Sequence, residues 1–438
     1  MNQDRLVIFH ILKDLMAEDA FDIDDSRYGD KITDFVRAAV YGTLTYMVTI
    51  DHIIKLASKR SVEDMDPDTA LVLRIGAWQL LFSDKVPEYA AVNTSVELAK
   101  TVCRSSSGFV NAVLHKILEL PEDKKDRRLM RPDVRVSLKS EIFGVLKSSY
   151  GRERAISIGE AFLEVPPLTA RFDPKRISFE ELSLKLQKDG YGVKPGEFME
   201  EAVIITPSEI PIDKTAAFID GDIMMQGEGA MLASRIADPH PGDLVLDCCC
   251  APGGKTTHMA LLADDDLTIL AMDKKGARLE RVRENLQRLK IRSVELSEGD
   301  GTTFRSDRLF DIILADVPCS GTGLLGGKPD IRVKLDYERI KSLIPVQAEI
   351  LSNISSYVAP GGTLVYSTCS VNKAENEKQI ESFLLDHPDF YADDITQYLP
   401  SKLIMDEERK ELAGRGMITL LPDTDHCEGF FVARLKRR

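Results

Sequence analysis

The chain has 438 residues, 43% of them hydrophobic and 29% charged, which is typical of a globular protein with two or three domains. Its first residues, Met1 to Asp19, mix charged and apolar side chains, which predicts an amphipathic helix rather than a signal peptide. No stretch approaches the run of about 18 apolar residues that spans a bilayer. Seven cysteines, three of them adjacent, do not resemble a disulfide framework and favour a reducing cytoplasm as the location.

The net charge of −14 argues against a protein that attracts nucleic acid over its whole surface. Basic side chains are nevertheless concentrated between Lys124 and Lys139, between Arg278 and Arg292, and in the tail from Arg434 to Arg438. Such clusters are most often solvated faces. The charge distribution therefore favours local rather than general attraction to RNA.

The N-terminal part of the chain is expected to be all-helical. Apolar residues recur with helical spacing in five segments, 6–16, 32–56, 69–82, 89–101 and 108–118. Asp66-Pro67-Asp68 is a helix start signal, and Pro87 is expected to open the next helix. The stretch from Leu118 to Pro132 is charged and bounded by proline, and we interpret it as a linker.

The rest of the chain contains a mixed segment followed by a regular alternation of strands and helices. Between residue 134 and about residue 220 we expect a helix over 152–164, and short apolar runs such as 202–205 lie among scattered glycine and proline residues. Apolar strands are then expected at 244–247, 268–272, 310–315 and 362–366, with helices at 256–263, 276–289 and 337–357 between them. This alternation predicts a parallel, doubly wound sheet.

A glycine-rich turn follows the first of these strands, at Asp247-Cys248-Cys249-Cys250-Ala251-Pro252-Gly253-Gly254-Lys255. It lacks the spacing of a dinucleotide fingerprint and the first glycine of a P-loop. Asp273 at the end of the next strand is placed to accept hydrogen bonds from a ribose diol, and Asp300 to hold an adenine edge. This set fits S-adenosylmethionine best, and a purely structural tight turn is the alternative. Adjacent cysteines cannot converge on one tetrahedral metal ion, so packing is the expected role of the triplet.

Two further cysteines lie directly after buried strands, where the chemistry of open α/β sheets is found. Cys319 lies in Asp316-Val317-Pro318-Cys319-Ser320-Gly321, and Cys369 lies in Ser367-Thr368-Cys369-Ser370. Each cysteine alone is more typical of a small buried hydrophobe. Their shared placement favours one thiol that attacks a substrate and one that assists its release.

About residues 220–438 resemble the Sun-type RNA cytosine carbon-5 methyltransferases. The resemblance rests on the glycine-rich turn, the two cysteine segments, Glu375-Asn376-Glu377 and the ending Glu428 to Ala433. Residues 74–80, 86–93 and 108–114 resemble a NusB-like RNA-binding helical domain. The pairing is similar to the RsmB type of this family, which implies small-subunit ribosomal RNA as substrate. The expected domains are therefore a NusB-like domain over 1–125, a linker and small α/β subdomain over 126–220, and a Rossmann-like catalytic domain over 221–438.

The resemblance also implies the role of each site residue. Cys369 would add to carbon 6 of cytosine, Cys319 would assist loss of the carbon-5 proton, and Asp316 would hydrogen-bond the cytosine edge. The residues expected to hold S-adenosylmethionine are Cys249, Cys250, Ala251, Pro252, Gly253, Gly254, Lys255, Asp273, Arg278, Asp300 and Asp316. RNA is the expected partner, no membrane or metal is expected, and the protein is expected to act as a monomer.

Three other functions stay open at this point. A DNA cytosine methyltransferase would use Cys319 as the attacking thiol, transfer RNA is an alternative substrate, and a NusB-like assembly factor would need no catalysis. Trp78 is expected in the core and His258 at a partly exposed helix position. Asn93 and Asn111 fit either polar core or RNA contacts, and Glu375 and Glu377 are expected to cap or brace the helix after Cys369.

Overall fold

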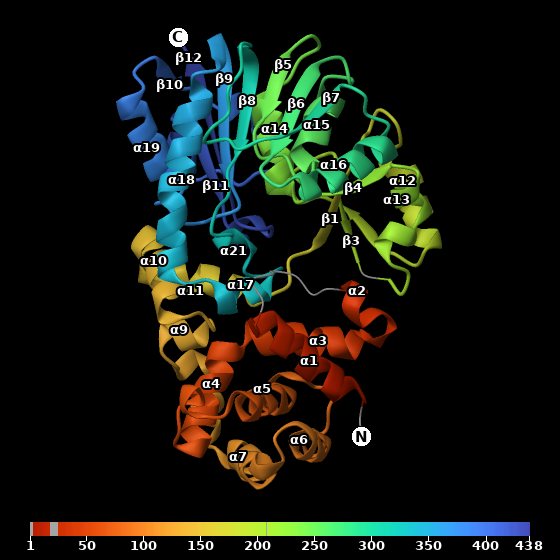
Figure 1. Cartoon of the computed structure of the whole chain (residues 1–438), viewed down its shortest axis with the longest axis vertical. Coiled ribbons are helices and arrows are strands. Elements are labelled where there is room, and N and C mark those ends of the chain that lie inside the picture. Colours follow the sequence, from red (N-terminus) through yellow and green to blue (C-terminus); the bar gives the residue numbers. More distant parts are fainter. Residues whose placement is uncertain (1–2, 18–24, 207) are drawn as a thin grey trace. The chain divides into compact units, whose positions relative to one another are not determined.

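The computed structural model describes residues 3–17, 25–206 and 208–438, and these residues form two compact units (Figure 1). One unit comprises residues 1–165 together with residues 324–337, and the other comprises residues 166–323 and 338–438. The division does not follow the predicted boundaries at residues 125 and 220. In the parts of the chain that are described, no helix is both long enough and apolar enough to cross a bilayer.

The first unit is helical. Its helices are α1 (Gln3–Ala17), α2 (Asp25–Tyr28), α3 (Asp34–Thr45), α4 (Met47–Ser58), α5 (Pro67–Phe82), α6 (Glu88–Val102), α7 (Ser107–Glu119), α8 (Glu122–Lys125), α9 (Pro132–Arg135), α10 (Ser140–Tyr150), α11 (Arg152–Ala161) and α17 (Pro329–Lys334). Asp66 caps α5 by accepting a hydrogen bond from the Thr69 amide, as the start signal predicts. Trp78 is buried, which confirms its expected place in the core.

The single helix expected over residues 32–56 is wrong, because the chain bends at Tyr46 between α3 and α4. Tyr46 leaves the helical conformation, and its ring stacks on Phe82 with the centroids 4.0 Å apart. A contact with a residue 36 positions away decides this break, so the apolar periodicity of the segment contains no sign of it.

Residues 126–165 join the helical unit instead of forming a linker to the next domain. The Thr49 hydroxyl donates to the carbonyl oxygen of Val134 at 2.6 Å, and Arg135 pairs with Glu160 at 2.7 Å. These contacts attach the short helix α9 to α4 and α11. The charged stretch between Leu118 and Pro132 therefore connects elements within one unit.

The segment 324–337 belongs to the helical unit although it follows the Cys319 loop in the sequence. Its helix α17 packs against α3 and α1, and Val333 contacts their apolar core. The buried Arg332 donates to four backbone carbonyl oxygens, those of Leu325, Val136, Ser137 and Phe162. Burial lowers the pKa of Arg332 to about 9. The four carbonyl oxygens compensate the guanidinium group for its lost hydration.

The second unit begins with a small antiparallel sheet of order β2-β3-β1-β4. Its elements are β1 (Leu168–Phe172), α12 (Phe179–Lys188), β2 (Val193–Pro195), β3 (Ala202–Ile205), α13 (Ala216–Ile219) and β4 (Ile223–Met225). The short apolar run at 202–205 forms the buried strand β3. A capping box between Ser178 and Glu181 starts α12, which covers the sheet with the buried Leu182 and Leu186.

The larger sheet of this unit has the order β10-β12-β9-β8-β5-β6-β7, and β11 pairs with β12. Strands β5 to β9 are parallel, and β12 runs antiparallel to β9. Its elements are α14 (Glu228–Ala237), β5 (Leu244–Asp247), α15 (Gly254–Leu262), β6 (Thr268–Asp273), α16 (Gly276–Leu289), β7 (Val294–Glu298), β8 (Phe310–Asp316), α18 (Tyr337–Ser355), β9 (Val358–Thr368), α19 (Glu377–Asp386), β10 (Phe390–Ala392), α20 (Glu407–Gly414), β11 (Met417–Leu420), α21 (Pro422–Asp425) and β12 (Phe430–Arg437).

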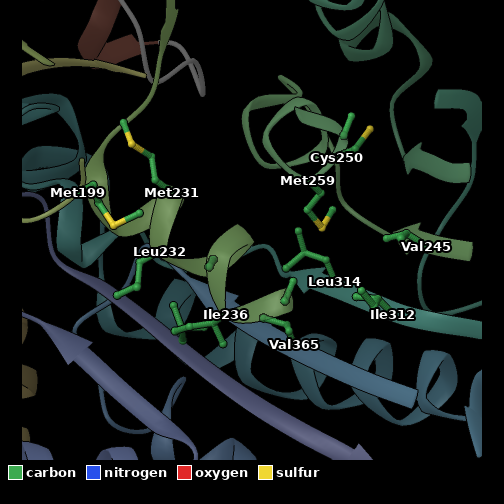
Figure 2. Close-up of a cluster of buried hydrophobic side chains, with 14 of the residues drawn as sticks. Met199, Met231, Leu232, Ile236, Val245, Cys250, Met259, Ile312, Leu314 and Val365 are labelled. Atoms are coloured by element: carbon green, nitrogen blue, oxygen red, sulfur yellow. The ribbon is translucent and has the colours of Figure 1, made fainter. Parts of the chain in front are cut away.

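Helices cover both faces of this sheet, so the predicted doubly wound arrangement is confirmed (Figure 1). On one face, Met231 and Ile236 of α14 and Met259 of α15 pack against strand residues such as Leu314 and Val365 (Figure 2). On the other face, α18 and α19 cover a second apolar cluster. Because both faces of the sheet are covered, the central parallel strands β5, β6, β8 and β9 are mostly apolar, and polar side chains collect beyond their carboxyl ends.

Candidate active site

The structure brings the two predicted thiols together. Strands β8 and β9 are adjacent and parallel, with Asp316 opposite Ser367, so the segments that follow them leave the sheet at the same edge. Cys319 lies three residues beyond Asp316, and Cys369 directly follows β9. Their Sγ atoms are 3.1 Å apart. This separation allows both thiols to contact one substrate atom or two neighbouring ones.

A partly buried ion pair lies beside the thiols. The Lys255 ammonium at the start of α15 is 2.7 Å from the Asp316 carboxylate, which also accepts a hydrogen bond from the Ser367 hydroxyl at 2.7 Å. Burial alone would lower the pKa of Lys255, but the attraction of Asp316 and of Cys369 outweighs it and raises this pKa. The site therefore holds a fixed positive charge next to Cys369.

The two thiols differ in their surroundings. The contact with Cys369, together with burial, raises the pKa of the Cys319 thiol well above its usual range. Cys319 is therefore held as a neutral thiol in the resting protein. The Cys319 thiolate, once formed, is correspondingly more basic than that of an ordinary cysteine.

The glycine-rich turn joins β5 to α15. The Cys250 amide donates to the Met272 carbonyl oxygen at 2.9 Å, and the Gly253 amide donates to the Cys250 carbonyl oxygen at 2.7 Å. Gly253 has φ of +97°, and a Cβ there would lie 3.0 Å from Val282, so a side chain would be strained. The turn leads directly into the N-terminus of α15, whose first N–H groups have no partner in the helix.

Packing explains the cysteine triplet better than metal binding does. Cys248 and Cys250 are buried in apolar clusters on opposite faces of the sheet. Burial raises the pKa of Cys250, which disfavours a thiolate ligand. Within the described ranges, no three His, Cys, Asp or Glu side chains gather as a metal site would require.

The predicted acidic cofactor residues follow the next two strands. Asp273, the last residue of β6, pairs with Arg278 at 3.1 Å, and Arg278 also donates to the Ala251 carbonyl oxygen at 3.0 Å. Asp300, two residues after β7, pairs with Lys274 at 2.7 Å and accepts from the Thr302 amide. Each carboxylate has lone pairs beyond those used here. A glycine turn, a helix N-terminus and two carboxylates at successive strand ends fit an adenosine-bearing cofactor.

Sequence reasoning missed Arg171, which reaches this turn from β1 of the small sheet. Arg171 is only 2% exposed and donates to the Gly254 carbonyl oxygen at 2.8 Å, to Thr257 at 3.0 Å and to the Gln226 side chain. Burial lowers its pKa to about 9. The one signal in the sequence is a charged residue within an otherwise apolar strand.

Two expectations about other residues are corrected by the structure. His258 is buried, not partly exposed, and the carboxylate of Glu201, in the turn before β3, lies 3.4 Å from its Nε2. Glu375 does not brace the following helix, since its carboxylate accepts hydrogen bonds from Ser320 and Ser370 in the two cysteine loops. Asn93 and Asn111 are exposed, which excludes the polar-core alternative.

Comparisons with known proteins identify the family of the chain. A family model described as 16S rRNA methyltransferase RsmB/F matches residues 234–436, and the model of the NusB family matches residues 2–119. The chain is 32% identical to a probable ribosomal RNA small subunit methyltransferase B of Synechocystis sp., over 99% of each protein.

Solved structures share the fold. The crystal structure of PH0851 has a TM-score of 0.80 at 24% identity and covers 99% of this chain and 98% of that one. A methyltransferase homolog protein from Pyrococcus horikoshii is 30% identical, with a TM-score of 0.58, and covers 70% of this chain and 98% of that one. The predicted NusB-like helical region and Rossmann-like methyltransferase fold are confirmed.

Proposed function

The chain belongs to the RsmB/F family of 16S rRNA methyltransferases, and we propose that it methylates carbon 5 of a cytosine in small-subunit ribosomal RNA through a covalent cysteine adduct. The thiol pair 3.1 Å apart beside the partly buried Lys255 is the observation that carries this proposal. Carbon 5 of a pyrimidine is a weak nucleophile until another group adds to carbon 6. One thiol is needed to form this adduct and another base is needed to resolve it.

Cys369 is the attacking residue in this proposal. Its thiolate adds to carbon 6 of the cytosine, and the positive charge of Lys255 stabilises the thiolate. The raised pKa of Cys319 supports this assignment, because Cys319 stays protonated while Cys369 attacks. The target cytosine must first leave its base stack, at a cost of a few kcal/mol.

Asp316 holds the cytosine during the attack. Its carboxylate accepts a hydrogen bond from the exocyclic amino group, and the adjacent Lys255 stabilises the negative charge that moves into the ring. Ser367 fixes the other carboxylate oxygen through a 2.7 Å hydrogen bond. Both charged groups are thus oriented before the substrate arrives, which lowers the reorganisation that the reaction requires.

The turn at 249–255 together with Asp273, Arg278 and Asp300 would hold the cofactor. Asp273 would accept hydrogen bonds from the ribose hydroxyls, Asp300 would contact the adenine, and the N-terminus of α15 would attract the cofactor carboxylate. S-adenosylmethionine supplies the methyl group that carbon 5 takes up.

Cys319 resolves the methylated adduct. Once Cys369 has added, Cys319 gives its own proton to solvent. The resulting thiolate accepts the proton that leaves carbon 5, and the electron pair of the carbon 5–hydrogen bond forms the carbon 5–carbon 6 double bond. The carbon 6–sulfur bond breaks, and its electron pair returns to Cys369. The product is 5-methylcytosine, and both cysteines are regenerated after proton exchange with solvent. The high pKa that keeps Cys319 neutral at rest also makes its thiolate a stronger base for this step.

The test compares wild type, Cys369→Ala and Cys319→Ala with bacterial small-subunit ribosomal RNA and radiolabelled S-adenosylmethionine. Cys103→Ala is the matched control, because Cys103 is a free, partly exposed thiol in the helical unit. We expect no methyl transfer by Cys369→Ala, a trapped protein–RNA adduct with Cys319→Ala, and wild-type behaviour of the control.

Two outcomes would overturn the proposal. An adduct that forms in Cys369→Ala but not in Cys319→Ala would make Cys319 the attacking residue. Methyl transfer by wild type to transfer RNA and not to ribosomal RNA would overturn the proposed substrate, while the proposed reaction would still hold.

A further inference from the structure

Glu375 is a fully buried carboxylate outside the set of residues expected to take part in the reaction. It accepts five hydrogen bonds from neutral donors. The donors are the Ser320 backbone amide at 2.8 Å, the Ser320 hydroxyl at 2.6 Å, the Ser370 hydroxyl at 2.8 Å, the Gln347 side-chain amide at 3.0 Å and the Asn372 side-chain amide at 3.1 Å. A buried charge is retained only where such bonds compensate for its lost hydration.

All donors except Gln347 belong to the loops that carry the two thiols. Ser320 directly follows Cys319, and Ser370 directly follows Cys369. The third donor, Gln347 of α18, also donates to the Pro318 carbonyl oxygen on the other side of Cys319, at 3.0 Å. One carboxylate is therefore the common acceptor of groups that flank both cysteines.

We propose that Glu375 is a positioning residue that sets the separation and orientation of the Cys319 and Cys369 thiols, an inference that rests on the proposed two-cysteine reaction. Bonds from both loops to the same pair of oxygen atoms fix the loops relative to each other. A displacement of about 1 Å at reacting atoms reduces rates on the order of 100-fold. The 3.1 Å contact between the thiols is thus maintained by a residue that touches neither of them.

The charge of Glu375 matters as well as its size. Oε1 accepts from Ser320 and Gln347, and Oε2 accepts from Ser320, Ser370 and Asn372. In Glu375→Gln, one of these atoms becomes an NH₂ group. At the Oε1 position it would face two N–H donors, those of Ser320 and Gln347. At the Oε2 position it would face the NH₂ group of Asn372, and the two serine hydroxyls would have to reorient to accept from it. The substitution conserves the shape of the side chain and weakens the connection between the loops.

Glu377 provides a matched control two residues away. It is also a buried glutamate, but its carboxylate contacts Thr419 of β11 at 3.1 Å and neither cysteine loop. Glu377→Gln therefore removes a comparable buried charge without affecting the connection between the loops. A general effect of neutralising buried carboxylates would appear in both variants.

The experiment measures the thiols directly, in protein free of RNA. Diamide oxidises neighbouring thiols to a disulfide and is itself reduced to the hydrazine. The rate at which the Cys319–Cys369 peptide pair appears, followed by mass spectrometry, reports how often the sulfur atoms meet. We expect Glu375→Gln to slow this rate by about tenfold or more and to lower kcat about 100-fold, with the KM for RNA and the Kd for S-adenosylmethionine unchanged. Glu377→Gln should behave like wild type in all four measurements.

Glu375→Asp keeps the charge on a side chain one methylene shorter and should give intermediate values. If Glu375→Gln does not fold, the aspartate variant decides the question through the same bridging rate. A folded Glu375→Gln with wild-type bridging and kcat would overturn the inference. Slow bridging in Glu375→Gln, in a protein whose wild type methylates no RNA, would leave the positioning role standing and refute the proposed reaction instead.

Discussion

Gly323 lies where three backbone segments of the catalytic unit meet, and alanine at this position should disrupt the active site. The Gly323 amide donates to the Cys369 carbonyl oxygen at 2.9 Å, and the Gly429 amide donates to the Gly323 carbonyl oxygen at 2.9 Å. A Cβ at position 323 would lie 2.0 Å from the Gly429 oxygen and 2.8 Å from the Cys369 oxygen. All of these neighbours are backbone atoms, so no side chain can rotate away to make room.

The expected magnitude follows from this overlap. The Cβ would be about 1.4 Å closer to the Gly429 oxygen than ordinary van der Waals contact allows, so the chain must move by about that distance. Overpacking of this kind costs about 1–3 kcal/mol, which lowers Tm by roughly 2–4 °C for each kcal/mol in a domain of this size. Because Cys369 is one of the displaced residues, kcat should fall about 100-fold.

The assay combines methyl transfer with thermal unfolding of Gly323→Ala and of a control, Gly414→Ala. Gly414 ends α20, and a Cβ there would meet no atom within 4 Å. The control should keep wild-type activity and a Tm that is unchanged or slightly higher. A Gly323→Ala protein with kcat within about twofold of wild type and an unchanged Tm would refute the reasoning, since it would show that the backbone moves at little cost.

Three further predictions concern buried polar side chains near the cofactor turn. Arg171→Met leaves the Gly254 carbonyl oxygen without its donor, which should cost about 1–3 kcal/mol of stability and raise the Kd for S-adenosylmethionine in calorimetry; an unchanged Kd would contradict the bracing role. Burial lowers the pKa of His258 from 6.5 to about 4, so the unfolded chain takes up a proton in this range that the folded protein does not. The wild-type protein should therefore lose about 3 kcal/mol of stability relative to His258→Gln as the pH falls from 6.5 to 4. An equal dependence of unfolding free energy on pH in the two proteins would refute this. Burial raises the pKa of Asp247 from 3.8 to about 7, so between these pH values the folded protein keeps a proton that the unfolded chain releases. The wild-type protein should therefore lose about 4 kcal/mol of stability relative to Asp247→Asn as the pH rises from 3.8 to 7. Denaturant titrations across this range provide the check.

The features predicted from the sequence are those that local patterns determine. Apolar strands alternating with helices specify the doubly wound sheet, and side chains that follow parallel strands must meet at one edge. Cys319, Cys369 and Asp316 were therefore expected together, and the structure brings them together.

The features missed depend on contacts between distant parts of the chain. The bend at Tyr46 involves Phe82, and the buried His258 lies against Glu201, in the turn before β3. Arg171 and Glu375 are single charged residues whose role is set by partners that no periodicity identifies. Local sequence shows that Arg171 is unusual in a largely apolar strand, and it gives no such signal for Glu375; the partners of both residues are set only by the fold.

The segment 324–337 limits how this protein can be divided into fragments. The chain leaves the catalytic unit after Gly323 and returns to it at Glu338, while the residues between complete the helical unit. A fragment starting at Pro166 would contain Arg332 without the carbonyl oxygens of Val136, Ser137 and Phe162. A fragment ending at Val165 would lack the helix that packs on its own core. No single cut separates the two units. To produce each unit alone, residues 324–337 must be replaced by a short loop in the catalytic fragment and joined to the helical fragment.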